Sequence, residues 1–303
     1  MERVKVFVPG HLTGFFEICN GPNLLSTGSR GGGLSINSGM LTEILVKNYD
    51  EDVINIKING KKVNNAIVSK YVVDYFLKQV KPNNYYVEIN HTTEFPIGNG
   101  FGMSGGGALG ISYGLNVLLE LNKTRNECAQ VAHVAEVNSK TGLGDVIAQT
   151  FGGVEIRVEP GAPGIGVLEN ILFIPNLKVV CYTNGKIDTS SIISNKDRIN
   201  DINKAGNMLV KKLLKSPSIS NLMKLSFQFA QSSELITDDI LELLKILHSY
   251  GFQNASQIML GRSIFCIVNE NEVDKVKEII NDHTSKGNIF IANIDNQGAR
   301  IIG

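Results

Sequence analysis

The residues with the clearest chemistry are a run of glycines that leads into an apolar helix pattern. Residues 96–110 read PIGNGFGMSGGGALG and carry no charged side chain. Glycine lets backbone N–H groups approach an anion closely, and a helix N-terminus adds free donors and about half a positive charge. Such a ring of amides can hold the triphosphate of ATP without a lysine. We therefore predict a nucleotide site formed by Gly98, Gly100, Phe101, Gly102, Met103, Ser104, Gly105, Gly106, Gly107 and Ala108.

Other interpretations of this run fit the sequence less well. A Walker A motif needs a lysine, and none lies between Lys81 and Lys123. The pattern GxGxxG does occur at Gly100, Gly102 and Gly105. A Rossmann site, however, also needs a second strand that ends in an acid about 20 residues later, where this sequence has helical patterns. A purely structural loop remains an alternative, although three consecutive glycines before a helix are destabilising unless a ligand requires them.

Two acidic residues follow the glycine run at the edges of a second glycine turn. Glu136 precedes the turn, and the segment from Lys140 to Asp145 reads KTGLGD. The Glu136 carboxylate and the Ser104 hydroxyl are oxygen ligands that suit Mg²⁺ when phosphate oxygens complete its shell. Asp145 is placed to orient a substrate hydroxyl or to accept its proton. The alternative is an exposed helix acid and a helix N-cap.

One histidine and two arginines complete the set of candidate site residues. His11 follows Pro9-Gly10 at the predicted end of the first strand, and we expect it to stabilise charge on a transferred phosphoryl group. Arg30 and Arg157 are candidates to bind a substrate carboxylate with both arms of the guanidinium. A structural histidine and surface arginines are the alternatives. A strand–turn–strand segment at residues 255–265 carries Arg262, which could reach a phosphate.

The hydrophobic periodicity predicts an α+β chain in two halves. We divide it into residues 1–170 and residues 171–303, with a Pro/Gly linker at 160–166 before the boundary. Strands are predicted at 3–8, 34–46, 53–58, 61–63, 85–89, 153–158, 179–183, 257–268, 288–293 and 299–302, with a polar connection at 19–33. Helices are predicted at 66–80, from the glycine run to about 121, at 124–138, from 145, and at 199–215, 219–232, 238–250 and 271–285.

Composition excludes several classes of protein. The 303 residues include 29 Lys and Arg and 29 Asp and Glu, so the chain has no net field that would attract nucleic acid or anionic lipid. The charge-free run at 95–119 contains eight glycines, which argues against a membrane span. The first residues lack the pattern of a signal peptide. The four cysteines are scattered, so we expect reduced thiols and a cytoplasmic protein without nucleic-acid or membrane partners.

These segments, in this order and spacing, resemble the GHMP kinase superfamily over nearly the whole chain. Residues 96–108 resemble its phosphate motif PxxxGLGSSA, and Pro9-Gly10 matches its first motif. Glu136 and Asp145 have the spacing of its magnesium glutamate and catalytic aspartate. His11 stands where mevalonate kinases have a lysine, and the third motif, usually GSGxGG, is reduced to Met259-Leu-Gly-Arg262.

The resemblance implies a fold, a reaction and a set of roles. The fold is α+β, with an N-terminal domain like that of ribosomal protein S5 and a ferredoxin-like C-terminal domain. The activity is ATP-dependent phosphorylation of a small molecule, with Mg²⁺ at Ser104 and Glu136 and with Asp145 and His11 as catalytic residues. Kinases of this type are often dimers, so a homodimer is compatible with it.

Segments such as PGHLTGFFEI at 9–18, GSRGGGLSI at 28–36 and GGVEIRVEPGAPG at 152–164 are most similar to an archaeal branch of the superfamily. The acceptor in that branch is the terminal hydroxyl of a small hydroxy acid, whose carboxylate Arg30 or Arg157 would bind. Homoserine, shikimate or an isoprenoid alcohol is the alternative acceptor. A nucleotide-binding regulator that has lost catalysis is a further alternative.

Overall fold

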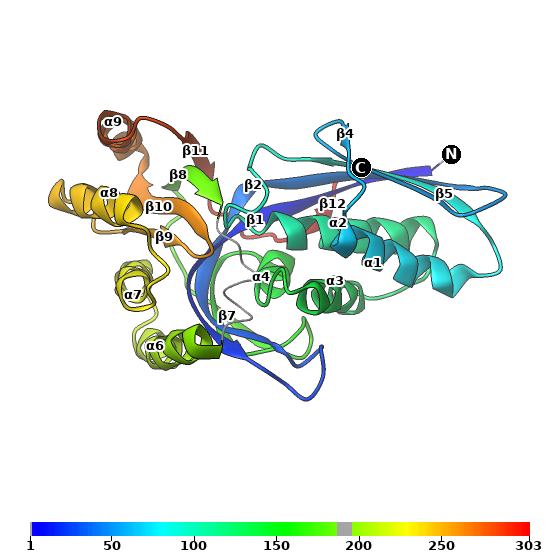
Figure 1. Ribbon diagram of the computed structural model, residues 1–303, viewed down its shortest axis with the longest axis horizontal. Coiled ribbons are helices and arrows are strands. Elements are labelled where there is room, and N and C mark those ends of the chain that lie inside the picture. The colour runs from blue at the N-terminus through cyan, green and yellow to red at the C-terminus, as the bar shows by residue number, and fades with distance from the viewer. Residues whose placement is uncertain (1, 187–195) are drawn as a thin grey trace.

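Two long antiparallel strands, β1 (Glu2–Cys19) and β2 (Gly28–Asn48), run through the centre of the molecule (Figure 1). The computed structural model describes residues 2–186 and 196–303. The first sheet has the order β12-β1-β2-β5-β3-β4, and β6 joins it by pairing with both β2 and β7. Its other strands are β3 (Val53–Ile58), β4 (Lys61–Lys62), β5 (Tyr85–Thr92), β6 (Val154–Glu159), β7 (Val167–Asn170) and β12 (Arg300–Ile301).

Four helices pack against one half of this sheet: α1 (Ile67–Leu77), which continues as the 3₁₀ turn η1 (Lys78–Val80), α2 (Met103–Leu118), α3 (Arg125–Ser139) and α4 (Asp145–Phe151). Helix α2 lies close to the sheet because glycines recur on one face. A side chain at Gly110 would come within 2.5 Å of the Thr42 hydroxyl, and one at Gly114 within 2.3 Å of Ile44. A capping box of Thr124 and Glu127 starts α3.

The second sheet contains β8 (Leu177–Lys186), β9 (Ala255–Ile258), β10 (Gly261–Asn269) and β11 (Asn288–Asn293), all antiparallel, in the order β11-β8-β10-β9. Numbered along the chain, this order is 4-1-3-2, which is ferredoxin-like. Helices α8 (Asp238–Ser249) and α9 (Val273–His283), the latter after the turn η2 (Glu270–Glu272), share its core. Helices α6 (Lys196–Lys215) and α7 (Ile219–Ser232) pack against β1. The predicted α+β fold class is confirmed.

The structure corrects the predicted start of the chain. Strand β1 does not end at Pro9-Gly10 but continues to Cys19, because a bulge at this point absorbs the proline. The predicted polar connection at 19–33 is also too long, because β2 begins at Gly28. A side chain at Gly31 would lie 2.2 Å from the Phe15 carbonyl oxygen, so the glycines here allow close contact between two strands and do not form a turn.

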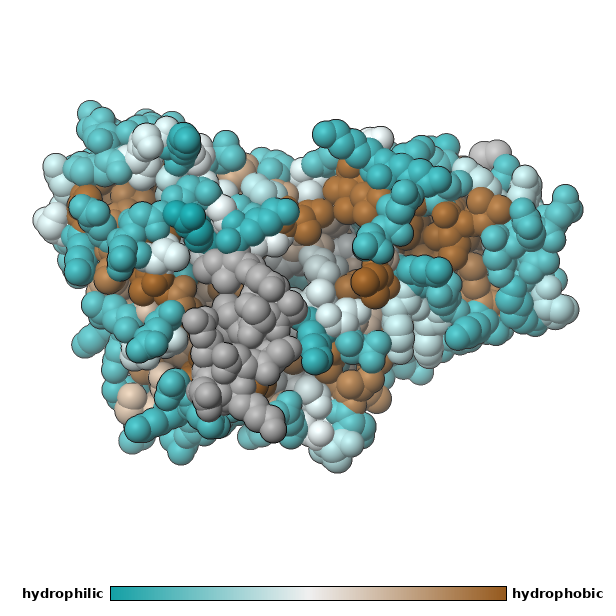
Figure 2. Space-filling model, in the orientation of Figure 1, coloured by the Kyte–Doolittle hydropathy of each residue, from teal (hydrophilic) through white to brown (hydrophobic). Residues whose placement is uncertain are grey.

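The C-terminal segment returns to the first sheet. Arg300 and Ile301 form β12, which pairs with β1, and Ile294 bridges to Ile36 of β2. The residues that follow β11, the last strand of the second sheet, therefore contact both β1 and β2 of the first sheet. The division of the chain near residue 170 stays a prediction. None of the described helices is long and apolar enough to cross a membrane. The face shown in Figure 2 is largely hydrophilic, with hydrophobic residues gathered over the region of the first sheet and its helices.

Candidate active site between the two sheets

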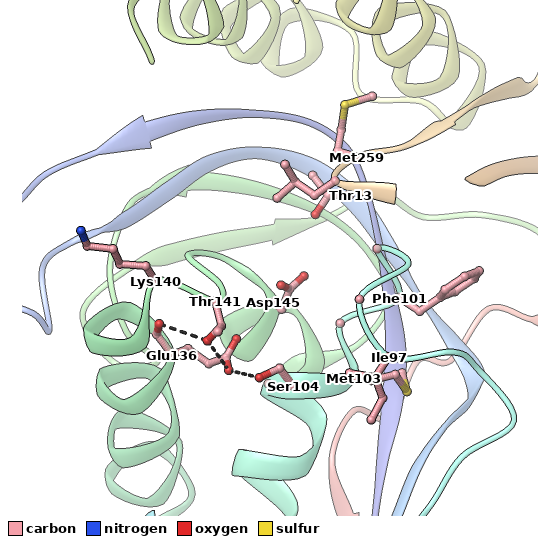
Figure 3. Close-up of a pocket in the computed structure, with 15 residues that line it drawn as sticks. Thr13, Ile97, Phe101, Met103, Ser104, Glu136, Lys140, Thr141, Asp145 and Met259 are labelled. Atoms are coloured by element: carbon pink, nitrogen blue, oxygen red, sulfur yellow. Dashed lines mark hydrogen bonds between the residues drawn. The ribbon is translucent and has the colours of Figure 1, made fainter. Parts of the chain in front are cut away.

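The glycine run forms a tight loop between β5 and α2. Gly100 and Gly102 have φ angles of 90° and 71°, in the left-handed region that favours glycine. Gly102 is the residue before the first turn of α2, and no side chain of the described residues caps this helix. The amides of the first turn therefore remain available to an anion. They open into a cavity of about 380 Å³ (Figure 3).

Only some of the residues in the predicted phosphate site line the cavity. The loop residues Gly98, Gly100, Phe101, Gly102, Met103, Ser104 and Gly105 line the cavity. The amide of Gly106 already donates to the Gly102 carbonyl, inside the helix. Gly106 faces Met40, Gly107 faces His91, and Ala108 is fully buried in the core under the sheet. These three positions thus serve helix packing, and the run of glycines is longer than the part of it that lines the cavity.

The other walls of the cavity come from distant parts of the chain. Met259 and Leu260, in the reduced third motif, lie beside the loop, and a side chain at Gly100 would come within 2.9 Å of the Met259 carbonyl oxygen. The Phe101 ring points into the core and stacks on Phe95 at a centroid distance of 4.3 Å. Arg262 does not reach this cavity, because it pairs with Asp239 at 2.8 Å.

Ser104 and Glu136 lie side by side at the edge of the cavity (Figure 3). The Ser104 hydroxyl donates to Glu136 Oε1 at 2.5 Å, and the Thr141 hydroxyl donates to the same oxygen at 2.9 Å. Burial raises the pKa of Glu136 to about 7, against the opposing effect of the Ser104 hydrogen bond. Among the described residues, no group of three or more acidic, histidine or cysteine side chains is arranged to hold a metal ion by itself. One carboxylate and one hydroxyl suit Mg²⁺, which binds through few protein groups together with substrate phosphates.

Asp145 faces the same cavity and begins a row of alternating charges. His11 Nδ1 lies 2.6 Å from Asp145 Oδ1, and His11 Nε2 lies 2.8 Å from Glu155 Oε1. Arg157 Nη1 then donates to Glu155 Oε1 at 2.5 Å. Burial by itself would lower the pKa of His11, but the charges and hydrogen bonds of Glu155 and Asp145 outweigh it and raise the pKa to about 9.

The position of His11 corrects its predicted role. It lies inside β1, not at the end of a strand, and it is fully buried. Both ring nitrogens face carboxylates, and His11 is absent from the described residues that line the cavity. A phosphoryl group in the cavity would meet Asp145 and the loop amides, with His11 behind them.

A second, small cavity of about 30 Å³ adjoins the first and shares Thr13, Asp145 and Leu260 with it. Arg157 and Ser29 also line this cavity. Arg157 is only 1% exposed, and its Nε and Nη2 atoms have no hydrogen-bond partner among the described residues. Such buried, unpaired donors next to Asp145 indicate a place for an anionic group.

The other predicted arginine lies elsewhere. Arg30 donates to the Val158 carbonyl at 2.7 Å and pairs with Glu17 at 3.3 Å. Neither set of cavity-lining residues in the described chain includes it. Its polar atoms are thus engaged in holding β2 to its neighbours, so the structure favours Arg157 over Arg30 for a substrate anion.

Several site residues carried too weak a signal in the sequence. Thr13, Ser29 and Thr141 are small hydroxyl residues without a motif, and they line the two cavities. For Glu155, the alternation of residue types in β6 could have predicted a place beside Arg157. In β6 the apolar Val154 and Ile156 point to one face, which leaves Glu155 and Arg157 together on the other face of a buried strand.

Comparison with known proteins identifies relatives of this architecture. Residues 66–153 match the family model described as GHMP kinases N terminal domain. The chain is 40% identical over 276 residues to the pantoate kinase of Methanocaldococcus jannaschii, covering 91% of this chain and 96% of that protein. It is 33% identical over 282 residues to the pantoate kinase of Thermococcus kodakarensis, covering 92% of each. A solved structure described as a phosphotransferase related to the CoA biosynthesis pathway superposes over 99% of this chain and 98% of its own, with a TM-score of 0.90 and 32% identity.

The fold and the relatives are those of small-molecule kinases, and the chain belongs to the GHMP kinase superfamily. Within that superfamily, the two relatives described above are pantoate kinases from archaea. The resemblance seen in the sequence is therefore confirmed at the level of the superfamily and of its archaeal branch.

Proposed function

We propose that this protein transfers the γ-phosphoryl group of ATP to the 4-hydroxyl of (R)-pantoate and forms 4-phosphopantoate for coenzyme A biosynthesis. The observation that carries the proposal is the Arg157 side chain beside Asp145, whose Nε and Nη2 atoms have no hydrogen-bond partner among the described residues, in a chain 40% identical to a pantoate kinase. Pantoate has a carboxylate for the arginine and a terminal hydroxyl for the acid. The small cavity joins the two.

The nucleotide side of the reaction is served by the loop before α2. The amides of Met103, Ser104 and Gly105 would bind phosphate oxygens of ATP. Ser104 and Glu136 would hold Mg²⁺, which when bound neutralises charge that develops on the phosphate oxygens. Phosphoryl transfer of this kind depends on position and electrostatics, and the loop supplies both.

The acceptor side is served by Asp145 and Arg157. Arg157 would bind the pantoate carboxylate through the two nitrogen atoms that have no partner, with the Ser29 hydroxyl in the same cavity. Asp145 Oδ1 is occupied by His11, so its other oxygen would orient the 4-hydroxyl and accept its proton as the phosphoryl group arrives. Leu143 and Leu260 line the remaining wall of this cavity and exclude water.

Substrate choice tests the proposal directly. We expect a coupled ADP-release assay to show turnover with (R)-pantoate and little with (S)-pantoate, homoserine, shikimate or mevalonate. Preferred turnover with one of the other alcohols would instead support another GHMP kinase activity. Binding of ATP without transfer to any of them would support a regulator that has lost catalysis.

The arginine assignment is tested by Arg157→Lys. Lysine keeps a positive charge beside Glu155 but lacks the fork that binds a carboxylate through two donors. We expect a loss of about 1.5–3 kcal/mol of binding, so that KM for pantoate rises roughly 10- to 100-fold while KM for ATP stays the same. The control is Arg30→Lys, which alters a guanidinium engaged with Glu17 and should leave both constants unchanged. A higher pantoate KM in the Arg30 variant alone would reverse the assignment.

A further inference from the structure

Glu155 is a buried acid that the proposed reaction does not use. Its side chain is fully buried, and its Oε1 atom accepts hydrogen bonds from both His11 and Arg157. Its Oε2 atom has no partner among the described residues. A buried carboxylate is strongly destabilising unless cations surround it. Glu155 therefore needs both of its neighbours in the charged form.

The hydrogen-bond geometry determines the charge of His11. A neutral imidazole has one N–H and one lone pair, whereas each ring nitrogen here faces a carboxylate oxygen at 2.6 or 2.8 Å. A lone pair directed at either ionised carboxylate would be repulsive, so with Asp145 and Glu155 both ionised each ring nitrogen carries a proton. The charged groups around His11 are Asp145 from α4 and Glu155 and Arg157 from β6, with the Thr13 hydroxyl at 3.5 Å on its own strand.

The surrounding backbone leaves room for this row only because of three glycines. A side chain at Gly33 would lie 2.8 Å from Glu155 Oε1 and 2.9 Å from His11 Nε2. One at Gly31 or Gly144 would come within 2.8 Å of the Arg157 guanidinium. The glycines of the 28–33 segment thus accommodate the row of charges in addition to the close contact of β1 and β2.

We propose that Glu155 is a positioning residue, which holds His11 as an imidazolium so that Asp145 is fixed with one oxygen bound and the other directed at the acceptor hydroxyl. The inference rests on the proposed function, because it assigns the role of Asp145 in that reaction. It follows that His11 has no lone pair to accept a proton, so within this row the group that can take the proton of the acceptor hydroxyl is Asp145. Through Arg157, the same carboxylate also links the anion-binding cavity to Asp145.

The charge of His11 is measured by ¹⁵N NMR of histidine-labelled protein without substrate. The chain has five histidines, and the His11→Gln variant identifies the signals of His11. We expect the wild-type ring to show two protonated nitrogens from pH 6 to pH 8. In Glu155→Gln, where the amide keeps the shape of the side chain but not its charge, the titration should move down by about 2 pH units.

The kinetic consequence of the same substitution has a defined sign. When His11 loses its proton in Glu155→Gln, Asp145 loses its cationic partner, so kcat should fall as pH rises through the lowered pKa. We expect a loss of up to about 10²-fold at the alkaline end, recovery towards acid, and an unchanged KM for ATP. Glu159→Gln, the same change at an exposed position of β6, should follow the wild-type profile.

Two results would overturn the inference: a neutral His11 ring in the wild-type protein at pH 7, or an unchanged His11 titration in Glu155→Gln. If that variant does not fold, the wild-type spectrum still decides, and Glu155→Asp, which keeps the charge, should retain the imidazolium. The spectra need no substrate, so a wrong choice of acceptor would leave them unchanged. A neutral His11, in turn, would remove the role of Glu155 and leave the proposed acceptor in place.

Discussion

Asp145→Asn is expected to lower kcat by about 10³-fold, because a positioned acid or base contributes roughly 10²- to 10⁴-fold to such a reaction. The asparagine oxygen can still accept the hydrogen bond that His11 donates to Oδ1 at 2.6 Å. The side chain thus keeps its shape and its partner but loses the charge that the acceptor hydroxyl requires. Steady-state ADP release with saturating ATP and (R)-pantoate measures the loss.

A measurement of nucleotide binding shows whether the lower kcat of Asp145→Asn comes from the lost carboxylate or from a damaged fold. The amides at the start of α2 and the pair Ser104–Glu136 make no hydrogen bond to Asp145 among the described residues, so a non-hydrolysable ATP analogue should bind the variant as it binds the wild type. Asp239→Asn is the matched control, because Asp239 is paired with Arg262 beside the second sheet. Near-normal turnover in Asp145→Asn would remove this residue from the chemistry.

The parts of the site that could be predicted from sequence are those encoded within one short segment. The loop at 96–105 and the capping box of Thr124 and Glu127 depend on neighbours a few residues away, and such patterns are readable along the chain. Ser104, in the first turn of α2, and Glu136, near the end of α3, are 32 positions apart, and they were paired through the preference of Mg²⁺ for oxygen ligands and not through a local pattern. The two-part α+β fold followed from periodicity, which is local as well.

The parts that could not be predicted depend on contacts between distant segments. His11 and Glu155 are 144 positions apart, and no pattern around either residue specifies the other. Pro9-Gly10 was predicted to end the first strand, and this was wrong because the bulge that lets β1 continue depends on its pairing with β2. The glycines at 31–33 resembled a loop for the same reason. Glycine is required at these positions because strand β1 and the charged side chains of His11, Glu155 and Arg157 lie against them. Neighbouring residues in the sequence give no sign of these contacts.

The glycines of β2 leave space for the row of charged side chains that contacts Asp145. A phosphate loop alone would bind a nucleotide, but acceptor chemistry also needs an acid held at a fixed place in front of the cavity. In the proposed reaction the row from Asp145 through His11 and Glu155 to Arg157 provides that hold. His11, Glu155 and Arg157 are buried, where unpaired charges would be strongly destabilising. Any change that pushes one member aside leaves its neighbours unpaired. The row is therefore expected to respond as a unit to a change in the space around it.

Gly33→Ala is expected to lower stability and activity together. The new methyl carbon would lie 2.4 Å from the Leu12 carbonyl oxygen, which belongs to the paired strand and cannot rotate away as a side chain could. Overpacking in a core typically lowers stability by 1–3 kcal/mol, and contact with backbone places this change at the upper end, about 3 kcal/mol. We expect Tm to fall by roughly 5 °C in thermal unfolding of the protein without ligands.

The same methyl carbon would also approach Glu155 Oε1 and His11 Nε2, so the folded variant should lose turnover about 10²-fold when assayed well below its Tm. Gly185→Ala is the matched control, since it adds a methyl group to a strand glycine whose nearest neighbour is a flexible arginine at 3.4 Å. That variant should unfold at nearly the wild-type temperature and keep its activity. If Gly33→Ala lost stability but kept full turnover, the row of charges would tolerate displacement, and its tight packing would have no part in placing Asp145.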